Sequence, residues 1–297
     1  IYEYKMSHKQ LDRTNASIHQ MVVYRIMKGN RSPYLQQPTV AEAKKMKGEE
    51  LLALFTDVRQ YDCSILYSGT RSSQEVAGLL SHTLNSSFSQ CHLAAPDNVI
   101  RLQEYNEPLV YVYDMPDSRQ SIIGTYCSIK SSLTDKEEAQ LRLWSQYMGG
   151  GMSSLLFQEI REFRAMAYAT QGHVIMPNRV RHSDHPSGFL GYLGTQGDKA
   201  MQALAVLDSL MSDMPVNEQN VAAAKQEILN DINNNYPSFR QRANDVSSWY
   251  MNGYKEDPRT SLSRMVPTLT TDDMTGFYRS NIQQKPRIYY IIGNKKQ

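Results

Sequence analysis

Histidine is the first residue type to consider, because imidazole serves both as a metal ligand and as a general base. Zinc peptidases use the spacing H-x-x-E-H or H-E-x-x-H, which places two His ligands and a Glu base on one helix. None of the seven histidines begins either spacing, so the sequence contains no zinc helix of these types. The histidines are His8, His19, His82, His92, His173, His182 and His185. The nearest cluster, from His182 to His185, indicates a solvated loop rather than a metal site.

The triplet Gly149-Gly150-Gly151 invites comparison with a phosphate-binding loop. A loop of that kind follows a strand and ends in Lys-Ser or Lys-Thr. This triplet instead follows a predicted helix, and no such pair comes after it, so we discount phosphate binding. Cys63, Cys91 and Cys127 lie far apart without metal-type spacing and indicate buried or idle thiols.

The stretch from Tyr147 to Tyr168 is the most informative for chemistry. It is typical of a glycine turn, a hydroxyl-capped helix over 153–163 with a charged end, and a strand that opens on Tyr168. Arg161 and Tyr168 stand seven residues apart. A guanidinium offers fixed donors to a carbonyl group, and a phenol can stabilise a developing oxyanion. Spacing alone favours a simpler interpretation, a helix-end cation and a packed strand aromatic. Glu159 and Glu162 have no His partner and indicate surface or bridging charges.

The elements that must position this stretch follow from local patterns. Runs rich in β-branched and aromatic residues predict strands over 109–113, 122–129, 167–176, 188–195 and 287–292. A capping box from Thr134 to Glu137 predicts the start of the helix that ends at the glycine triplet. Later helices are predicted over 201–211, 221–232 and 239–251 and from residue 271 onward. This order predicts an α+β fold, a mostly antiparallel sheet with helices packed on one face.

Residues before 107 have a different pattern. It predicts helices over 10–28, 48–58 and 73–84, a strand over 63–68 and a polar linker over 85–98. The helix and strand within 46–69 resemble those within 269–293, including an upstream aromatic helix end and a proline loop. Duplication explains this similarity, and a chance likeness of two helix–strand units is the alternative. Duplication predicts the end of one domain over 1–95, a linker over 96–106 and a complete duplicated domain over 107–297. Because the chain opens on Ile1 rather than Met, we interpret it as a segment of a longer protein.

The stretch from Tyr147 to Tyr168 resembles the C-terminal, non-zinc-binding half of insulinase/pitrilysin-family zinc metallopeptidases, in which a glycine turn leads into an LFqeiRe…AY segment. The resemblance implies a clamshell of four related α+β domains. The N-terminal half supplies zinc through H-x-x-E-H, and the C-terminal half closes the chamber. An Arg and a Tyr seven residues apart hold the peptide near the zinc, and these positions match Arg161 and Tyr168. The resemblance therefore implies substrate-binding residues here, but no catalytic residue and no metal ligand.

Three functions stay open at this stage. The first is the substrate-clamping half of a zinc endopeptidase, with a zinc-bearing N-terminal half, fused or separate, and a peptide as partners. The second is an inactive structural or processing subunit, against which the Arg161 and Tyr168 pair argues. The third is a stand-alone peptide-binding module. The net charge of +2 gives no argument for nucleic acid, and no apolar run approaches a membrane span. The family resemblance favours the bacterial periplasm or cell envelope.

Overall fold

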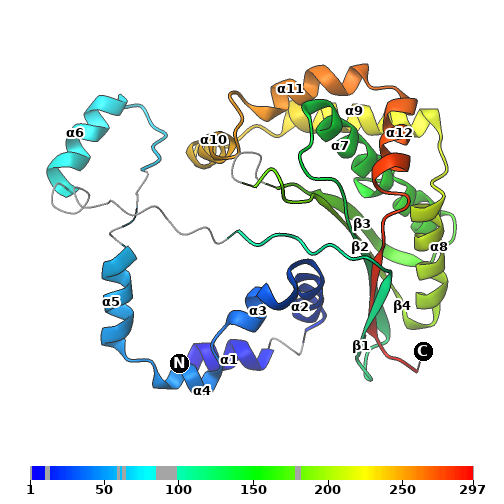
Figure 1. Ribbon diagram of the computed structural model, residues 1–297, viewed down its shortest axis with the longest axis horizontal. Coiled ribbons are helices and arrows are strands. Elements are labelled where there is room, and N and C mark those ends of the chain that lie inside the picture. The colour runs from blue at the N-terminus through cyan, green and yellow to red at the C-terminus, as the bar shows by residue number, and fades with distance from the viewer. Residues whose placement is uncertain are drawn as a thin grey trace.

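A five-stranded sheet forms the centre of the protein (Figure 1). The computed structural model describes residues 2–10, 14–58, 61, 65–84, 99–177 and 182–296. The strand order is β1-β5-β2-β4-β3, in which β1 and β5 run parallel and every other pair is antiparallel. The bounds are β1 Leu109–Asp114, β2 Gln120–Ser128, β3 Ala167–Ile175, β4 Gly188–Gln196 and β5 Ile288–Gly293. The predicted α+β fold with a mostly antiparallel sheet is confirmed.

One face of the sheet lies under a layer of helices (Figure 1). These helices are α7 Asp135–Gly149, α8 Ala200–Ser212, α9 Glu218–Asn234, α11 Pro258–Met265 and α12 Thr271–Asn281, with short 3-10 turns at Gly197–Lys199 and Val266–Thr268. Helix α10 (Arg242–Met251) lies at the end of this layer and buries none of its residues. Trp144 of α7 lies at the centre of the core between sheet and helices, with its ring 4.8 Å from that of Phe189. Truncation of a buried aromatic side chain of this size costs about 3–5 kcal/mol. The core therefore fixes α7, and the glycines at its end, against the sheet.

The second face of the sheet is partly covered by α2 (Asn15–Lys28). Ile18 and Ile26 of α2 pack with Tyr126 and Tyr290 in a separate buried cluster. His19 Nε2 lies 2.9 Å from the Tyr290 hydroxyl, and burial lowers the pKa of His19. The sequence predicted helices on one face only, because an amphipathic helix pattern does not say which side of a sheet it will cover. The helix α2 is thus an addition to the predicted arrangement.

Local sequence explains where two of the core helices begin. Thr134 and Glu137 form the predicted capping box of α7, with each side chain bonded to the other's backbone N–H group. Thr270 and Asp273 form the same motif at α12, so this helix begins at Thr271 as predicted. A cap of this kind stabilises a helix by about 1 kcal/mol. Both starts are set by neighbours three residues away, which is why the sequence predicts them.

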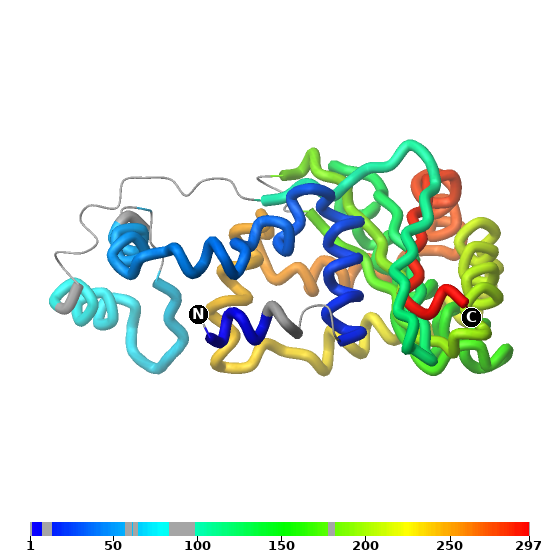
Figure 2. Tube along the Cα trace, turned by 90° about the horizontal axis from the view of Figure 1, so that it is seen from below, coloured from blue at the N-terminus to red at the C-terminus, as the bar shows by residue number. Residues whose placement is uncertain are grey.

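The first part of the chain is helical, and α5 and α6 stand apart from the sheet in both views (Figures 1 and 2). The helices are α1 Tyr2–Gln10, α3 Pro33–Gln36, α4 Val40–Lys45, α5 Gly48–Val58 and α6 Ser73–Leu84, with a 3-10 turn at Gly29–Arg31. The strand predicted over 63–68 is wrong for residues 65–68, which have no regular structure. A strand needs a neighbour to pair with, and the described residues provide none there. Residues 62–64 and the predicted linker over 85–98 lie outside the described part of the chain.

Candidate functional site

The predicted glycine turn lies where the end of α7 meets β3. A Cβ atom on Gly149 would stand 2.6 Å from both the N and Cα atoms of Gly172 in β3. A Cβ atom on Gly151 would stand 2.7 Å from the Glu227 carboxylate of α9. The amide N–H of Gly150 donates to the Gln146 carbonyl at 3.0 Å and closes the last turn of α7. The glycines therefore serve close backbone packing of α7 against the sheet.

Arg161 lies on a π-helical turn, η2 (Leu156–Glu162), within the segment predicted as a helix over 153–163. Leu156 and Ile160 are buried, and they anchor this turn to the core. The Arg161 side chain is 44% exposed, with its Nε atom 3.6 Å from Glu162, and its guanidinium lies 4.6 Å from the Phe157 ring centroid. Single-turn π-helices occur frequently at functional sites. The guanidinium is thus held in place while most of its donors face solvent.

The acidic residues of the same turn bridge to arginines, as predicted. Glu159 forms an ion pair with Arg164, and Glu162 with Arg161. An ion pair between partly exposed side chains of this kind stabilises the fold by at most about 1 kcal/mol. Neither glutamate is therefore a candidate for chemistry.

Tyr168 lies at a β-bulge near the start of β3 and is 49% exposed. Its ring covers Gly194 of β4, where an added Cβ atom would come within 2.7 Å of the ring. Its hydroxyl donates to the Gln120 side-chain oxygen at 3.3 Å. Bulges often redirect a side chain beside an active site. The phenol of Tyr168 is thus directed by the bulge and supported by a glycine, but it is neither buried nor packed in the core.

The turn between η2 and β3 fixes the spacing of Arg161 and Tyr168. Ala165 has a left-handed φ of 47°, which costs an alanine about 1 kcal/mol. Its carbonyl accepts a hydrogen bond from Lys199 Nζ at 3.0 Å. The next carbonyl, of Met166, accepts from the Thr195 hydroxyl at 2.6 Å. Among the described residues, no hydrogen bond or ion pair joins Arg161 to Tyr168. Arg161 lies against Glu162, and Tyr168 donates to Gln120.

Beside the glycine turn lies a cavity of about 880 Å³ between β3, α7, α9 and α11. Four successive β3 residues, Gln171 to Val174, line it, together with Glu227 and Asp231 of α9. Glu227 accepts hydrogen bonds from the side chains of Gln146 and Ser153, at 2.6 and 2.9 Å. Sequence reasoning missed these cavity residues, because nothing in the local pattern joins α9 to β3.

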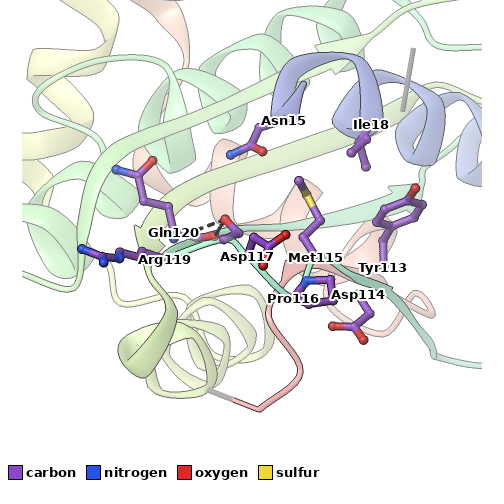
Figure 3. Close-up of a pocket in the computed structure, with 10 residues that line it drawn as sticks. Asn15, Ile18, Tyr113, Asp114, Met115, Pro116, Asp117, Arg119 and Gln120 are labelled. Atoms are coloured by element: carbon purple, nitrogen blue, oxygen red, sulfur yellow. Dashed lines mark hydrogen bonds between the residues drawn. The ribbon is translucent and has the colours of Figure 1, made fainter. Parts of the chain in front are cut away.

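A second cavity, of about 590 Å³, lies between the start of α2 and the β1–β2 turn. Figure 3 shows Asn15 and Ile18 on α2 facing this turn, with the Met115 side chain pointing toward the helix. Gln120, which accepts the Tyr168 hydrogen bond, also lines this cavity. Gln120 therefore connects the phenol to this space, while the glycine turn borders the larger one.

The described residues offer no group of three or more potential metal ligands. His182 and His185 stack with ring centroids 4.6 Å apart, but His182 is only 4% exposed, so its predicted place in a solvated loop is wrong. The ring packs because the loop folds back onto Ser132, whose N–H group donates to the Ser183 carbonyl.

Burial raises the pKa of the Cys127 thiol to about 12, as expected of an idle thiol. Cys63 and Cys91 lie outside the described residues.

Among the helices of the described residues, none combines the length and the apolar character needed to cross a bilayer. A search of curated proteins finds no match to the sequence. Solved structures show the same fold. A peptidase M16 inactive domain from Pseudomonas fluorescens matches with a TM-score of 0.71 and 13% identity, over 97% of this chain and 67% of that one.

Two larger proteases share the fold as well. The periplasmic protease PqqL from Escherichia coli matches with a TM-score of 0.64 and 13% identity, over 98% of this chain and 32% of that one. The ferredoxin protease FusC, in complex with Arabidopsis ferredoxin, matches with a TM-score of 0.64 and 13% identity, over 95% of this chain and 30% of that one. This chain therefore spans about a third of each protease.

The family assignment comes from the sequence itself. The model of the peptidase M16 inactive domain matches residues 72–228, which is more than half of the 297 residues. This match covers α7, the glycine turn, Arg161 and Tyr168. The chain belongs to the peptidase M16 inactive-domain family, which confirms its resemblance to the C-terminal half of an insulinase/pitrilysin-family metallopeptidase.

Proposed function

We propose that this chain is the substrate-clamping, chamber-closing half of a zinc metalloendopeptidase. The zinc and the catalytic Glu come from an H-x-x-E-H-bearing N-terminal half, either fused to this chain or separate from it. The observation that supports this proposal most is the placement of Arg161 and Tyr168. Both side chains are about half exposed and both are held by ordered elements. They lie in a chain that belongs to a family of inactive peptidase domains.

Each residue of the pair has a separate task in this proposal. The Arg161 guanidinium binds a backbone carbonyl of the peptide with two of its fixed donors. The Tyr168 phenol, once released from Gln120, donates a hydrogen bond to the oxygen on which negative charge develops at the scissile carbonyl. Closure against the other half removes water from both groups and strengthens these contacts. The isolated chain is therefore expected to bind peptides weakly and to cleave none.

A protein or peptide substrate and an envelope location belong to the same proposal. The FusC structure contains a ferredoxin, which supports a polypeptide substrate in this fold. PqqL is described as periplasmic, which supports a periplasmic or cell-envelope location. Zinc is proposed for the complete enzyme only.

The test combines this chain with its zinc-bearing half and measures peptide turnover. Arg161→Ala and Tyr168→Phe are each expected to lower kcat/KM by about 10- to 100-fold, the factor that corresponds to losing a donor contact of about 1.4–2.7 kcal/mol. Arg164→Ala and Tyr250→Phe are matched controls, since Arg164 pairs with Glu159 and Tyr250 is 80% exposed on α10. Zinc content should be unchanged in every variant. Wild-type turnover in both Arg161→Ala and Tyr168→Phe would overturn the proposed role of the pair.

A further inference from the structure

The cavity beside the glycine turn runs along an open sheet edge. In the described part of the chain, β3 is the last strand of the sheet and pairs only with β4. Four consecutive residues of this strand, Gln171 to Val174, line the cavity. Successive side chains of a strand point to opposite faces, so a cavity that touches all four borders the edge itself. The free N–H and C=O groups of an edge strand can pair with an added strand.

The charges around this cavity are not balanced. Among the residues that the structure describes, the Glu227 carboxylate accepts hydrogen bonds only from neutral groups, the Gln146 amide and the Ser153 hydroxyl. Within the same described part, the Asp231 carboxylate, one helical turn later on α9, accepts only from the Asn235 side-chain amide. Within the described residues, neither carboxylate forms an ion pair with a cation.

The cations that line the cavity already have anionic partners. Arg142 pairs with Glu138 at 2.9 Å, and Arg259 pairs with Asp257. Arg259 also donates to the Asn235 carbonyl at 2.7 Å, which keeps its guanidinium on the α9–α11 side. The cavity therefore retains an excess of negative charge at Glu227 and Asp231, which favours a cationic ligand.

We propose that an extended peptide adds to the open edge of β3 and places a lysine or arginine side chain in this cavity, against Glu227 and Asp231. The volume of about 880 Å³ accommodates such a side chain with room for its backbone. The backbone pairing supplies affinity for any extended segment, and the two carboxylates supply the preference for a basic residue. This inference rests on the proposed peptide-clamping function and names its substrate class.

The experiment measures binding of labelled peptides to the 297-residue chain by fluorescence anisotropy. Three nine-residue peptides of Thr, Val and Ser differ only at the central position, which is Lys, norleucine or Glu. Norleucine keeps the aliphatic stem of lysine but lacks its charge. The Lys peptide is expected to bind about 5- to 10-fold more tightly than the norleucine peptide, as for one charge-assisted contact at a partly exposed site. The Glu peptide should bind most weakly.

The variants identify the carboxylate. Glu227→Gln should reduce the preference for Lys over norleucine to about 2-fold, while Ser153 and Gln146 retain a polar partner. Glu218→Gln, with the same change of charge on the exposed first turn of α9, should leave the preference unchanged. Two further Lys peptides are N-methylated at alternate residues, one at the odd positions and one at the even positions, so that each loses one set of N–H donors. One of these two peptides should bind at least 10-fold more weakly than the unmethylated Lys peptide.

The outcomes separate this inference from the function on which it rests. If no peptide binds even at millimolar concentration, the peptide-clamping function fails and this inference fails with it. Equal affinity for the Lys and norleucine peptides, or an unchanged preference in Glu227→Gln, overturns the basic subsite alone. Full affinity of both N-methylated peptides overturns strand addition at β3. Self-association of the chain that the Lys peptide does not compete with, and that Glu227→Gln abolishes, would assign the cavity to a second copy instead.

Discussion

Replacing Gly149 with alanine is predicted to destabilise the fold, even though alanine is the better helix former. The new Cβ atom would stand 2.6 Å from the N and Cα atoms of Gly172. Carbon atoms in ordinary contact lie about 3.5–4.0 Å apart, so α7 must withdraw from β3 by about 1 Å. Both clashing atoms belong to backbone, and no side chain can rotate away to relieve the contact. Overpacking of this kind costs about 1–3 kcal/mol.

Helix propensity offsets part of that cost. Alanine in place of glycine stabilises a helix interior by about 1 kcal/mol, and Gly149 is the last residue of α7, so its gain is smaller. Because backbone must move, the overpacking cost should lie towards the upper end of its range, and after the helix gain we expect a net loss of about 2 kcal/mol. Urea unfolding followed by circular dichroism measures this loss, with an unchanged m-value.

Gly276→Ala is the matched control. Gly276 lies inside α12, and nothing stands within 4 Å of where its Cβ atom would be. Here only propensity acts, so the control variant should gain about 0.5–1 kcal/mol. The reasoning is refuted if Gly149→Ala is as stable as the wild type, because the close approach to Gly172 would then not limit the packing of α7.

Three further predictions follow from the site and its surroundings. Gly194→Ala should displace the Tyr168 ring, which its Cβ atom would meet at 2.7 Å, and should lower turnover in the reconstituted enzyme about as much as Tyr168→Phe while zinc content stays constant. Lys136 holds the pKa of Asp273 at about 2 through a hydrogen bond, supported by the backbone of the α12 cap. The stability from this carboxylate is present above its unfolded pKa of about 3.9 and is lost as pH falls towards 2. Because Lys136→Met removes the hydrogen-bond donor, it should raise the pKa of the Asp273 carboxyl group in an NMR titration. An unchanged pKa would contradict the assignment. Burial lowers the pKa of His19, so its contribution to stability is present above about pH 6.5 and is lost as pH falls below that value. His19→Gln should therefore lose less stability than the wild type between pH 7.5 and 5 in urea unfolding, and an equal loss in both proteins would contradict this account.

The sequence predicts features that depend on near neighbours. The capping box at Thr134 needs only Glu137, and β5 is recognisable from its run of isoleucine and tyrosine. The π-helical form of η2 was not predictable, because the apolar spacing of Leu156 and Ile160 suits an α-helix equally well. The strand expected over 63–68 failed for the opposite reason. Its residues favour a strand, but the described chain offers no neighbouring strand with which residues 65–68 could pair.

The candidate site divides in the same way. Arg161 and Tyr168 were found because a motif of contiguous sequence contains both of them. The cavity was not found, because Glu227 lies on α9 and meets the glycine turn only through the packing of α7. A carboxylate in a helix that has other exposed acidic residues gives no local sign of such a contact. Tertiary structure was needed to show that, among the described residues, Glu227 accepts hydrogen bonds from the neutral side chains of Gln146 and Ser153 alone.

The pair and the cavity lie along one strand, which sets the length of peptide that can engage both. Tyr168 stands near the start of β3, and His173, five residues later, lines the cavity. At about 3.3 Å per residue this separation is roughly 17 Å, which an added strand covers with about six residues. A tetrapeptide spans roughly 13 Å and can therefore engage only one end. Affinity for the chain should rise at least 10-fold between four and eight residues in a series of Lys-containing peptides, measured by anisotropy, and then level off. If the tetrapeptide binds as tightly as the octapeptide, Tyr168 and Glu227 do not act on one extended chain, and the two proposals would have to stand separately.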